Sequence, residues 1–195
     1  ESNFDPVIID QKCVIRAPFH DKFSDIPLRI TIEPKMSFGT GHHQTTRLML
    51  EQMLCINFNE KQVLDMGCGT GVLGILASLL GASLVYCIDP DRWAYENALE
   101  NIARNSVSNI HLIQGGKEKI PERVFDVVLA NINRNILIDQ IPVYSTITKK
   151  GSLLLISGIL DDDSPLIRQT AGENQFTYVE SRLLDGWKMI VFKRI

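Results

Sequence analysis

The chain has 195 residues, of which 45% are hydrophobic and 22% are charged, and its formal net charge is −3. These values are typical of one globular domain with a full hydrophobic core, and the charge gives no electrostatic reason to expect binding to nucleic acid or to an anionic membrane. No apolar run is long enough to span a bilayer, no signal-peptide pattern is present and the four cysteines show no CxxC spacing, so we expect a cytoplasmic protein with reduced thiols and no metal.

The first 35 residues have an irregular pattern. Apolar runs at residues 12–17 and 28–32, separated by Pro18 and Pro27, predict two short strands joined by a loop. A small-residue segment leads into a helix that is predicted over residues 43–56. We therefore divide the chain into an N-terminal strand and linker segment, residues 1–35, and a main domain, residues 36–195.

From residue 62 onward, strands and helices alternate. Strands are predicted at residues 63–66, 83–88, 110–113, 124–130 and 152–157. Helices are predicted at residues 72–80, 91–105, 135–149 and 161–172, and the apolar face of the second helix is marked by Ala94, Ala98, Leu99 and Ile102. Gly81 and Gly151 are expected to end the first and third helices. This alternation predicts parallel βαβ units with helices on both faces of one sheet.

The C-terminal segment departs from this alternation. Residues 176–184 and 187–193 are strand-like runs joined by Asp185-Gly186, and Asp-Gly between two such runs is a strong hairpin signal. The predicted fold class is therefore α/β, with a mostly parallel seven-stranded sheet, helices on both of its faces and a C-terminal antiparallel hairpin.

The predicted site centres on the stretch Val63-Leu64-Asp65-Met66-Gly67-Cys68-Gly69-Thr70-Gly71. A short apolar strand ends in an acid, three glycines follow at alternate positions, and a helix begins at once. Glycine allows the backbone to approach a ligand closely, and a helix start offers unpaired N–H groups and a partial positive charge. This pattern predicts a small, partly anionic ligand at the loop.

Two classes of ligand suit a loop of this kind. Residues 69–74 match the dinucleotide pattern GxGxxG, and Asp89 follows at about the distance of a ribose-binding acid. However, Asp65 at the tip of the strand would repel a pyrophosphate and suits a ligand with a cationic group. S-adenosylmethionine has an ammonium and a sulfonium, with a carboxylate for the loop amides and a ribose for Asp89. An NAD-dependent oxidoreductase is kept as the alternative.

Asp65-x-Gly67-x-Gly69-x-Gly71 and Ile88-Asp89 resemble motifs I and II of class I S-adenosylmethionine-dependent methyltransferases, whose Rossmann-like fold also ends in an antiparallel hairpin. The segment Phe38-Gly39-Thr40-Gly41-His42-His43-Gln44-Thr45-Thr46 further resembles the signature of the ribosomal protein methyltransferase family PrmA. Agreements at residues 129–132, 157–160 and 186–187 extend the resemblance over essentially the whole chain. It implies that residues 36–195 are a methyltransferase catalytic domain.

The resemblance also implies site residues and the cofactor S-adenosyl-L-methionine. The expected cofactor-binding residues, which match family positions or lie beside them, are Phe38, Thr45, Thr46, Asp65, Gly67, Gly69, Gly71, Asp89 and Asn131. Asn131 is also the catalytic candidate, because an acceptor at the carboxyl edge of the sheet would orient the attacking amine. His43 and Trp187 are interpreted as an ordinary cap or surface residue and a hairpin-packing residue.

The PrmA family methylates amines of the eleventh protein of the large ribosomal subunit. The resemblance therefore implies methyl transfer to amino groups, on lysine side chains or the N-terminus, of a large-subunit ribosomal protein, with no direct binding to nucleic acid or membrane. The family's N-terminal recognition domain is expected to precede residue 1 or to be missing. Alternatives are a methyltransferase for another protein, RNA or a small molecule, and, from other classes, a non-catalytic cofactor-binding module or the oxidoreductase.

Overall fold

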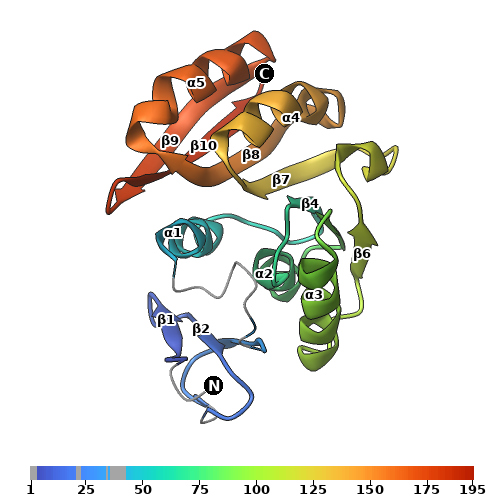
Figure 1. Cartoon of the computed structure of the whole chain (residues 1–195), viewed down its shortest axis with the longest axis vertical. Helices are drawn as coiled ribbons and strands as arrows, with labels where there is room; N and C mark the ends of the chain where they lie inside the picture. Colours follow the sequence, from blue (N-terminus) through green and yellow to red (C-terminus); the bar gives the residue numbers. More distant parts are fainter. Residues whose placement is uncertain (1–3, 21–22, 34, 36–42) are drawn as a thin grey trace.

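The chain folds around a seven-stranded sheet that carries helices on both faces (Figure 1). The structure is a computed structural model that describes residues 4–20, 23–33, 35 and 43–195. The strands of this sheet are β4 (Gln62–Met66), β5 (Leu84–Asp89), β6 (Ile110–Gln114), β7 (Phe125–Asn131), β8 (Thr148–Leu160), β9 (Phe176–Leu184) and β10 (Trp187–Arg194). Their order is β6-β5-β4-β7-β8-β10-β9, and β10 pairs antiparallel with both β8 and β9, while the other pairs are parallel. The predicted fold is confirmed.

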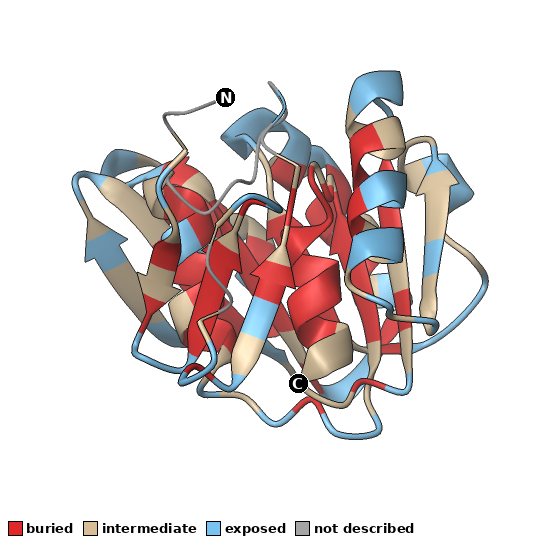
Figure 2. Ribbon diagram, turned by 90° about the horizontal axis from the view of Figure 1, so that it is seen from below, coloured by how far each residue is buried: buried red, intermediate tan, exposed pale blue. Residues whose placement is uncertain are grey.

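The helices divide the core into two layers. They are α1 (Gln44–Met53), α2 (Val72–Leu79), α3 (Arg92–Arg104), α4 (Arg134–Thr146) and α5 (Ser164–Glu173), with the short 3₁₀ helices η1 (Lys117–Lys119) and η2 (Asp161–Asp163). Successive strand residues face opposite layers, so that Val63 packs with α1, α2 and α3, whereas Leu64 packs with α4 and α5. Figure 2 shows the buried residues concentrated in the central strands and in α2. In the described ranges, no helix is long and apolar enough to cross a membrane.

The N-terminal segment forms a second, three-stranded sheet. Its strands are β1 (Val7–Ile9), β2 (Cys13–Arg16) and β3 (Leu28–Thr31), of which only β2 and β3 were expected. Ile9, Ile15 and Ile30 are fully buried in the same hydrophobic core as Met49 of α1. The small sheet thus covers the face of α1 and α2 that lies away from the large sheet. The predicted division of the chain at residue 35 stays a prediction.

The predicted end of the helix at residues 135–149 is wrong. Helix α4 ends at Thr146, and β8 begins at Thr148, so the chain enters the sheet before Gly151. β-Branched residues surround this change, and they favour the extended backbone over the last turn of a helix. Gly151 instead has a φ of +90° inside β8, where the register with β7 shifts. It allows a bulge rather than a helix stop.

The C-terminal hairpin is confirmed. Strands β9 and β10 are joined by Asp185 and Gly186, which both have positive φ, as a type I′ turn requires. The hairpin places Trp187, the first residue of β10, opposite Leu160 at the end of β8. This position brings Trp187 to the same edge of the sheet as the ends of β4, β5 and β7.

Candidate functional site

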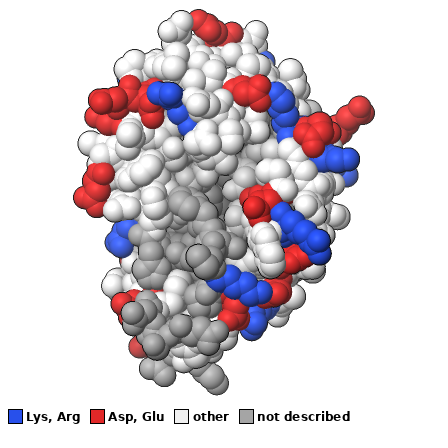
Figure 3. All heavy atoms as spheres, in the orientation of Figure 1, with Lys and Arg blue, Asp and Glu red and all other residues white. Residues whose placement is uncertain are grey.

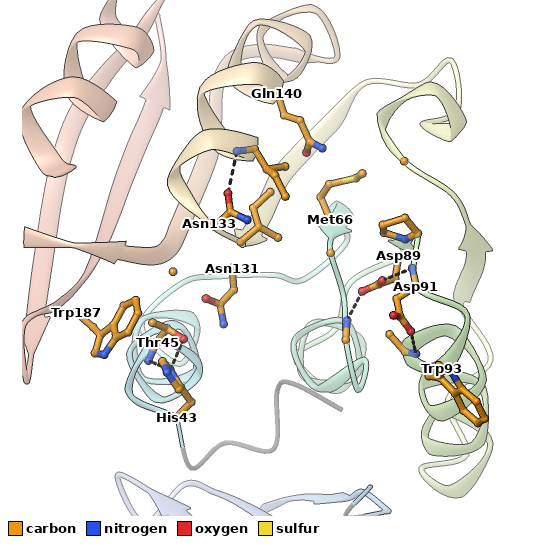
Figure 4. A pocket seen from close by; sticks show the side chains of 18 of the residues that line it. His43, Thr45, Met66, Asp89, Asp91, Trp93, Asn131, Asn133, Gln140 and Trp187 are labelled. Atoms are coloured by element: carbon orange, nitrogen blue, oxygen red, sulfur yellow. Dashed lines mark hydrogen bonds between the residues drawn. The ribbon is translucent and has the colours of Figure 1, made fainter. Parts of the chain in front are cut away.

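A cleft of about 900 Å³ lies at the carboxyl ends of the parallel strands (Figure 4). Five of the predicted site residues, contributed by three elements (α1, β5 and β7) and the loop after β4, line it: Thr45, Gly67, Gly69, Asp89 and Asn131. Open α/β sheets bind their ligands at this edge. Figure 3 shows a hollow near the middle of this face, with acidic and basic side chains interspersed around it rather than gathered by sign.

Among the described residues, the other predicted site residues do not line the cleft. Phe38 lies outside the described residues. Thr46 is fully buried, and its hydroxyl oxygen accepts a hydrogen bond of 3.3 Å from Nδ2 of Asn131. Gly71 is the N-cap of α2, with a φ of +79°. For these residues, contact with a cofactor stays a prediction.

Asp65 lies beneath the loop rather than in the cleft. Only 1% of it is exposed, and its Oδ2 accepts a 3.0 Å hydrogen bond from the backbone N–H of Gly74 in the first turns of α2. Its Oδ1 is buried without a hydrogen-bond partner in the described part of the chain. Burial raises the pKa of Asp65 to about 7; the Gly74 bond lowers it, and the nearby charge of Asp89 raises it. Asp65 thus holds the start of α2, and direct contact with a cofactor stays a prediction.

The N–H groups of the glycine loop after β4 donate hydrogen bonds within the protein. The amides of Gly67 and Cys68 both donate to the carbonyl of Ile88, and that of Gly71 donates to the carbonyl of Cys68. The amide of Gly69 donates to the side chain of Asp89. A loop of this sequence was expected to present free amides to an anion. In this structure, the first three of these amides along the chain tie the loop to the end of β5, and that of Gly71 closes the loop on itself.

Asp89 connects the loop with α3. Its Oδ2 accepts from Gly69 N–H at 2.9 Å and its Oδ1 accepts from Asp91 N–H at 2.9 Å, while Asp91 caps α3 through Ala94 N–H. Asp89 is 7% exposed and lines the cleft. Since each carboxylate oxygen has two lone pairs, Asp89 retains acceptor capacity for two hydroxyl groups on the cleft side.

Asn131 ends β7 on the opposite side of the cleft from Asp89 (Figure 4). Its Nδ2 is held by Thr46, whereas its Oδ1 is buried and has no partner among the described residues. The next residue, Ile132, donates its N–H to the carbonyl of Ser157. Gly158 permits this approach, because a Cβ there would lie 2.5 Å from the Ile132 carbonyl oxygen. The Oδ1 acceptor of Asn131 is therefore left without a partner among the described residues, next to a close backbone contact that Gly158 allows.

Three aromatic residues that line the cleft were missed in the sequence: His43, Trp93 and Trp187. His43 caps α1, as interpreted, but it also lines the cleft, and so does Trp187. Their rings lie 5.0 Å apart between centroids. Because the two residues are far apart in sequence, only the hairpin topology brings them together. The strand order, with β10 beside β8, is the signal that would have placed Trp187 at this edge.

Comparison with known proteins settles the family. A model of the family described as ribosomal protein L11 methyltransferase (PrmA) matches residues 1–195. The chain belongs to this family. A Porphyromonas gingivalis protein named ribosomal protein L11 methyltransferase is 43% identical over 190 residues, which are 97% of this chain and 66% of that protein. One of the same name from Chlorobaculum tepidum is 38% identical, over 96% of this chain and 66% of that protein. The chain thus spans about two thirds of the length of these relatives.

Solved structures agree with this family and fold. The structure of a ribosomal protein L11 methylase from Lactobacillus delbrueckii subsp. bulgaricus superimposes with a TM-score of 0.88 at 28% identity, over 97% of this chain and 98% of that chain. A methyltransferase from Pyrococcus furiosus has a TM-score of 0.64 at 16% identity, over 76% of this chain and 81% of that chain. The second likeness shows the fold alone.

Proposed function

We propose that this chain transfers methyl groups from S-adenosylmethionine to amino groups of ribosomal protein L11, on lysine side chains or at the N-terminus, in the cytoplasm. The observation that carries the proposal is the unpartnered Oδ1 of Asn131, in one cleft with Asp89 and the glycine loop. Membership of the PrmA family and the names of the relatives support the amine acceptor.

The described residues fit this cofactor. Asp89 offers its carboxylate to the hydroxyls of a ribose, as acids at the end of this strand do in nucleotide-binding sheets. Gly67 has a φ of +71°, and a Cβ there would overlap the side chain of Ile132, so backbone rather than side chain faces a ligand at this point. When bound, the cofactor supplies a methyl group that its sulfonium has already activated.

The protein's part in the reaction is to position a neutral amine. An alkylamine has a pKa of about 10.4, so it must lose a proton to water before it can attack. Oδ1 of Asn131 would then accept an N–H of the amine and orient its lone pair toward the methyl group. Asp89 and the glycine loop would hold the cofactor, which would supply an activated methyl group, and the methylated amine would lose its extra proton to water.

The dinucleotide alternative is disfavoured on new grounds. The charge of Asp65 gives no argument against a pyrophosphate, because that carboxylate lies under α2 and not in the cleft. The amides of Gly67, Cys68, Gly69 and Gly71, however, are bonded within the protein, so they do not form the cradle that a pyrophosphate needs.

Calorimetry and mass spectrometry test the proposal. The protein at its full length should bind S-adenosylmethionine and not NAD, and should add methyl groups to purified L11. Asn131→Ala should lower kcat about 100-fold through lost orientation of the amine, while the Kd for the cofactor changes less than tenfold.

Other outcomes would decide for the alternatives. Binding of NAD without S-adenosylmethionine would indicate an oxidoreductase. Cofactor binding with methylation only of another protein, RNA or a small molecule would change the acceptor. Cofactor binding without transfer to any acceptor would indicate a non-catalytic module.

A further inference from the structure

The cleft has an end that the cofactor contacts proposed above do not use. Figure 4 shows Asp89, Asp91 and Trp93 on one side, His43 and Trp187 on the other, and Asn131 between them. A ribose held at Asp89, with the reacting methyl group near Asn131, leaves the side of His43 and Trp187 for the molecule that receives the methyl group.

His43 and Trp187 form a corner in this part of the cleft. Their ring centroids are 5.0 Å apart, and their planes meet at 67°. The two rings come from the N-cap of α1 and the first residue of β10, so two well-anchored elements fix their relative position. A flat-walled corner of this kind suits a flexible alkyl chain, which buries apolar surface against both rings.

Thr45 holds the ring of His43 through hydrogen bonds to Nδ1. Its Nδ1 accepts from the backbone N–H of Thr45 and lies 2.8 Å from the hydroxyl oxygen of the same residue. Nδ1 is therefore engaged within the first turn of α1. As a result, the His43 ring adds no free acceptor at Nδ1 to the corner.

The electrostatics of this end disfavour a cation. The carboxylates that line the described part of the cleft are those of Asp89 and Asp91, which lie on the far side. The N-terminus of α1, with its partial positive charge, begins at His43. The Asp185 carboxylate in the hairpin turn accepts from Gln44 and is not among the residues that line the cleft. With a helix start and no carboxylate in the described lining on this side, an ammonium is not stabilised inside the cleft here, whereas the neutral amine that the reaction needs is not penalised.

We propose that His43 and Trp187 form an acceptor wall, which binds the alkyl stem of an uncharged primary amine and delivers its nitrogen to Asn131. The inference rests on the proposed function and specifies its substrate: a lysine-like side chain taken in its deprotonated form. The wall selects the neutral amine by apolar contact, and the ion pair that would hold the protonated form is missing from the described lining.

Two competitors and three variants test the acceptor wall in the full-length protein. A peptide acceptor is made with norleucine in place of its lysine, which keeps the stem without the amine, and with trimethyllysine, which is a permanent cation. The norleucine peptide should inhibit at least tenfold more strongly than the trimethyllysine peptide. Trp187→Leu should raise the KM for the peptide about tenfold at an unchanged Kd for S-adenosylmethionine, and Trp187→Phe should restore most of it.

His43→Asn separates binding from folding. Asparagine caps helices well, so this variant keeps the start of α1 and its thermal midpoint while it removes the ring. It should also raise the KM for the peptide, with the cofactor Kd unchanged. Stronger inhibition by trimethyllysine, or wild-type KM values in Trp187→Leu and His43→Asn, would overturn the acceptor wall but leave the function in place. A wild-type protein that methylates no amine would overturn both.

Discussion

At the scale of single residues, Asp65 shows how a buried acid is tied to the stability of the protein. One carboxylate oxygen is bonded to Gly74 N–H, and the other has no partner in the described part of the chain. Burial therefore penalises the charged form and raises the pKa of Asp65 to about 7, far above the value of an unfolded aspartate.

This shift predicts a pH dependence of stability. Between about pH 4 and pH 7, the unfolded chain has lost the Asp65 proton and the folded chain has kept it, so the free energy of unfolding falls as the pH rises. Asp65→Asn keeps an acceptor for Gly74 N–H and has no charge to bury. Urea unfolding at a series of pH values should therefore show a flatter profile for the variant over this range.

Asp126 provides a control of opposite sign. Burial alone would raise its pKa, but the N–H of Gln62 and the ammonium of Lys149 hold the pKa of this carboxyl below its ordinary value. Asp126→Asn should remove a contribution that is present above about pH 4 and lost at lower pH. If Asp65→Asn left the slope of unfolding free energy against pH unchanged between about pH 4 and pH 7, Asp65 would not be the group that keeps its proton in the folded state.

The sequence pattern located the side chains of Asp89 and Asn131 at the cleft, where the structure has them, but it did not show that the side chain of Asp65 lies beneath the loop. The first two end strands, and the ends of parallel strands meet at one edge, so the rule for open sheets locates them without coordinates. Asp65 also lies near the end of its strand, but its side chain shares the face of Val63, which packs under α2. Which face a helix covers depends on the handedness of the crossover and is not written in the local pattern.

At the scale of elements, the packing of α2 on β5 depends on a glycine. A Cβ at Gly74 would overlap Sγ of Cys87 and lie 3.4 Å from Oδ2 of Asp65. Gly74→Ala should therefore cost about 1–3 kcal/mol by overpacking, despite the better helix propensity of alanine. Adding Cys87→Ala should recover part of this loss, which a double-mutant cycle from urea unfolding would measure.

Gly172 in α5 is the matched control for this pair. No atom lies within 4 Å of the Cβ that alanine would add there, so Gly172→Ala should gain up to about 1 kcal/mol. Strictly additive effects of Gly74→Ala and Cys87→Ala would show that contact between the two positions is not the source of the cost.

The predicted elements succeed and fail for identifiable reasons. Long apolar runs and the Asp-Gly turn gave the seven strands of the large sheet, because both signals are local. Strand β1 was missed, since its three residues are too few to show a period. Helix α3 was found, but Leu99 is 52% exposed, whereas Asn97 and Asn101 are buried. The side chain of Asn101 is satisfied by Glu33 and Thr70, which are distant in sequence and which hydrophobic periodicity does not report. The side chain of Asn97 has no hydrogen-bond partner among the described residues.

At the scale of the whole molecule, Asn101 joins the N-terminal sheet to the glycine loop. This fully buried side chain accepts from Glu33 N–H at 2.8 Å and donates to the carbonyl of Thr70 at 2.9 Å. One turn further along α3, Asn105 accepts from Thr31 N–H and donates to the carbonyl of the same residue. Asn105 holds the last residue of β3, Asn101 holds the segment after it, and only Asn101 also reaches the loop.

This difference predicts distinct effects of two similar changes. Asn101→Ala leaves Glu33 N–H and the Thr70 carbonyl without their partner, and should cost about 2–4 kcal/mol of unfolding free energy and raise the Kd for S-adenosylmethionine several-fold. Asn105→Ala should speed hydrogen exchange at Thr31 but leave that Kd within twofold of wild type. Exchange by mass spectrometry and calorimetry measure the two effects. An equal change of Kd in both variants would mean that the N-terminal sheet, rather than the Asn101 bond to Thr70, supports the loop.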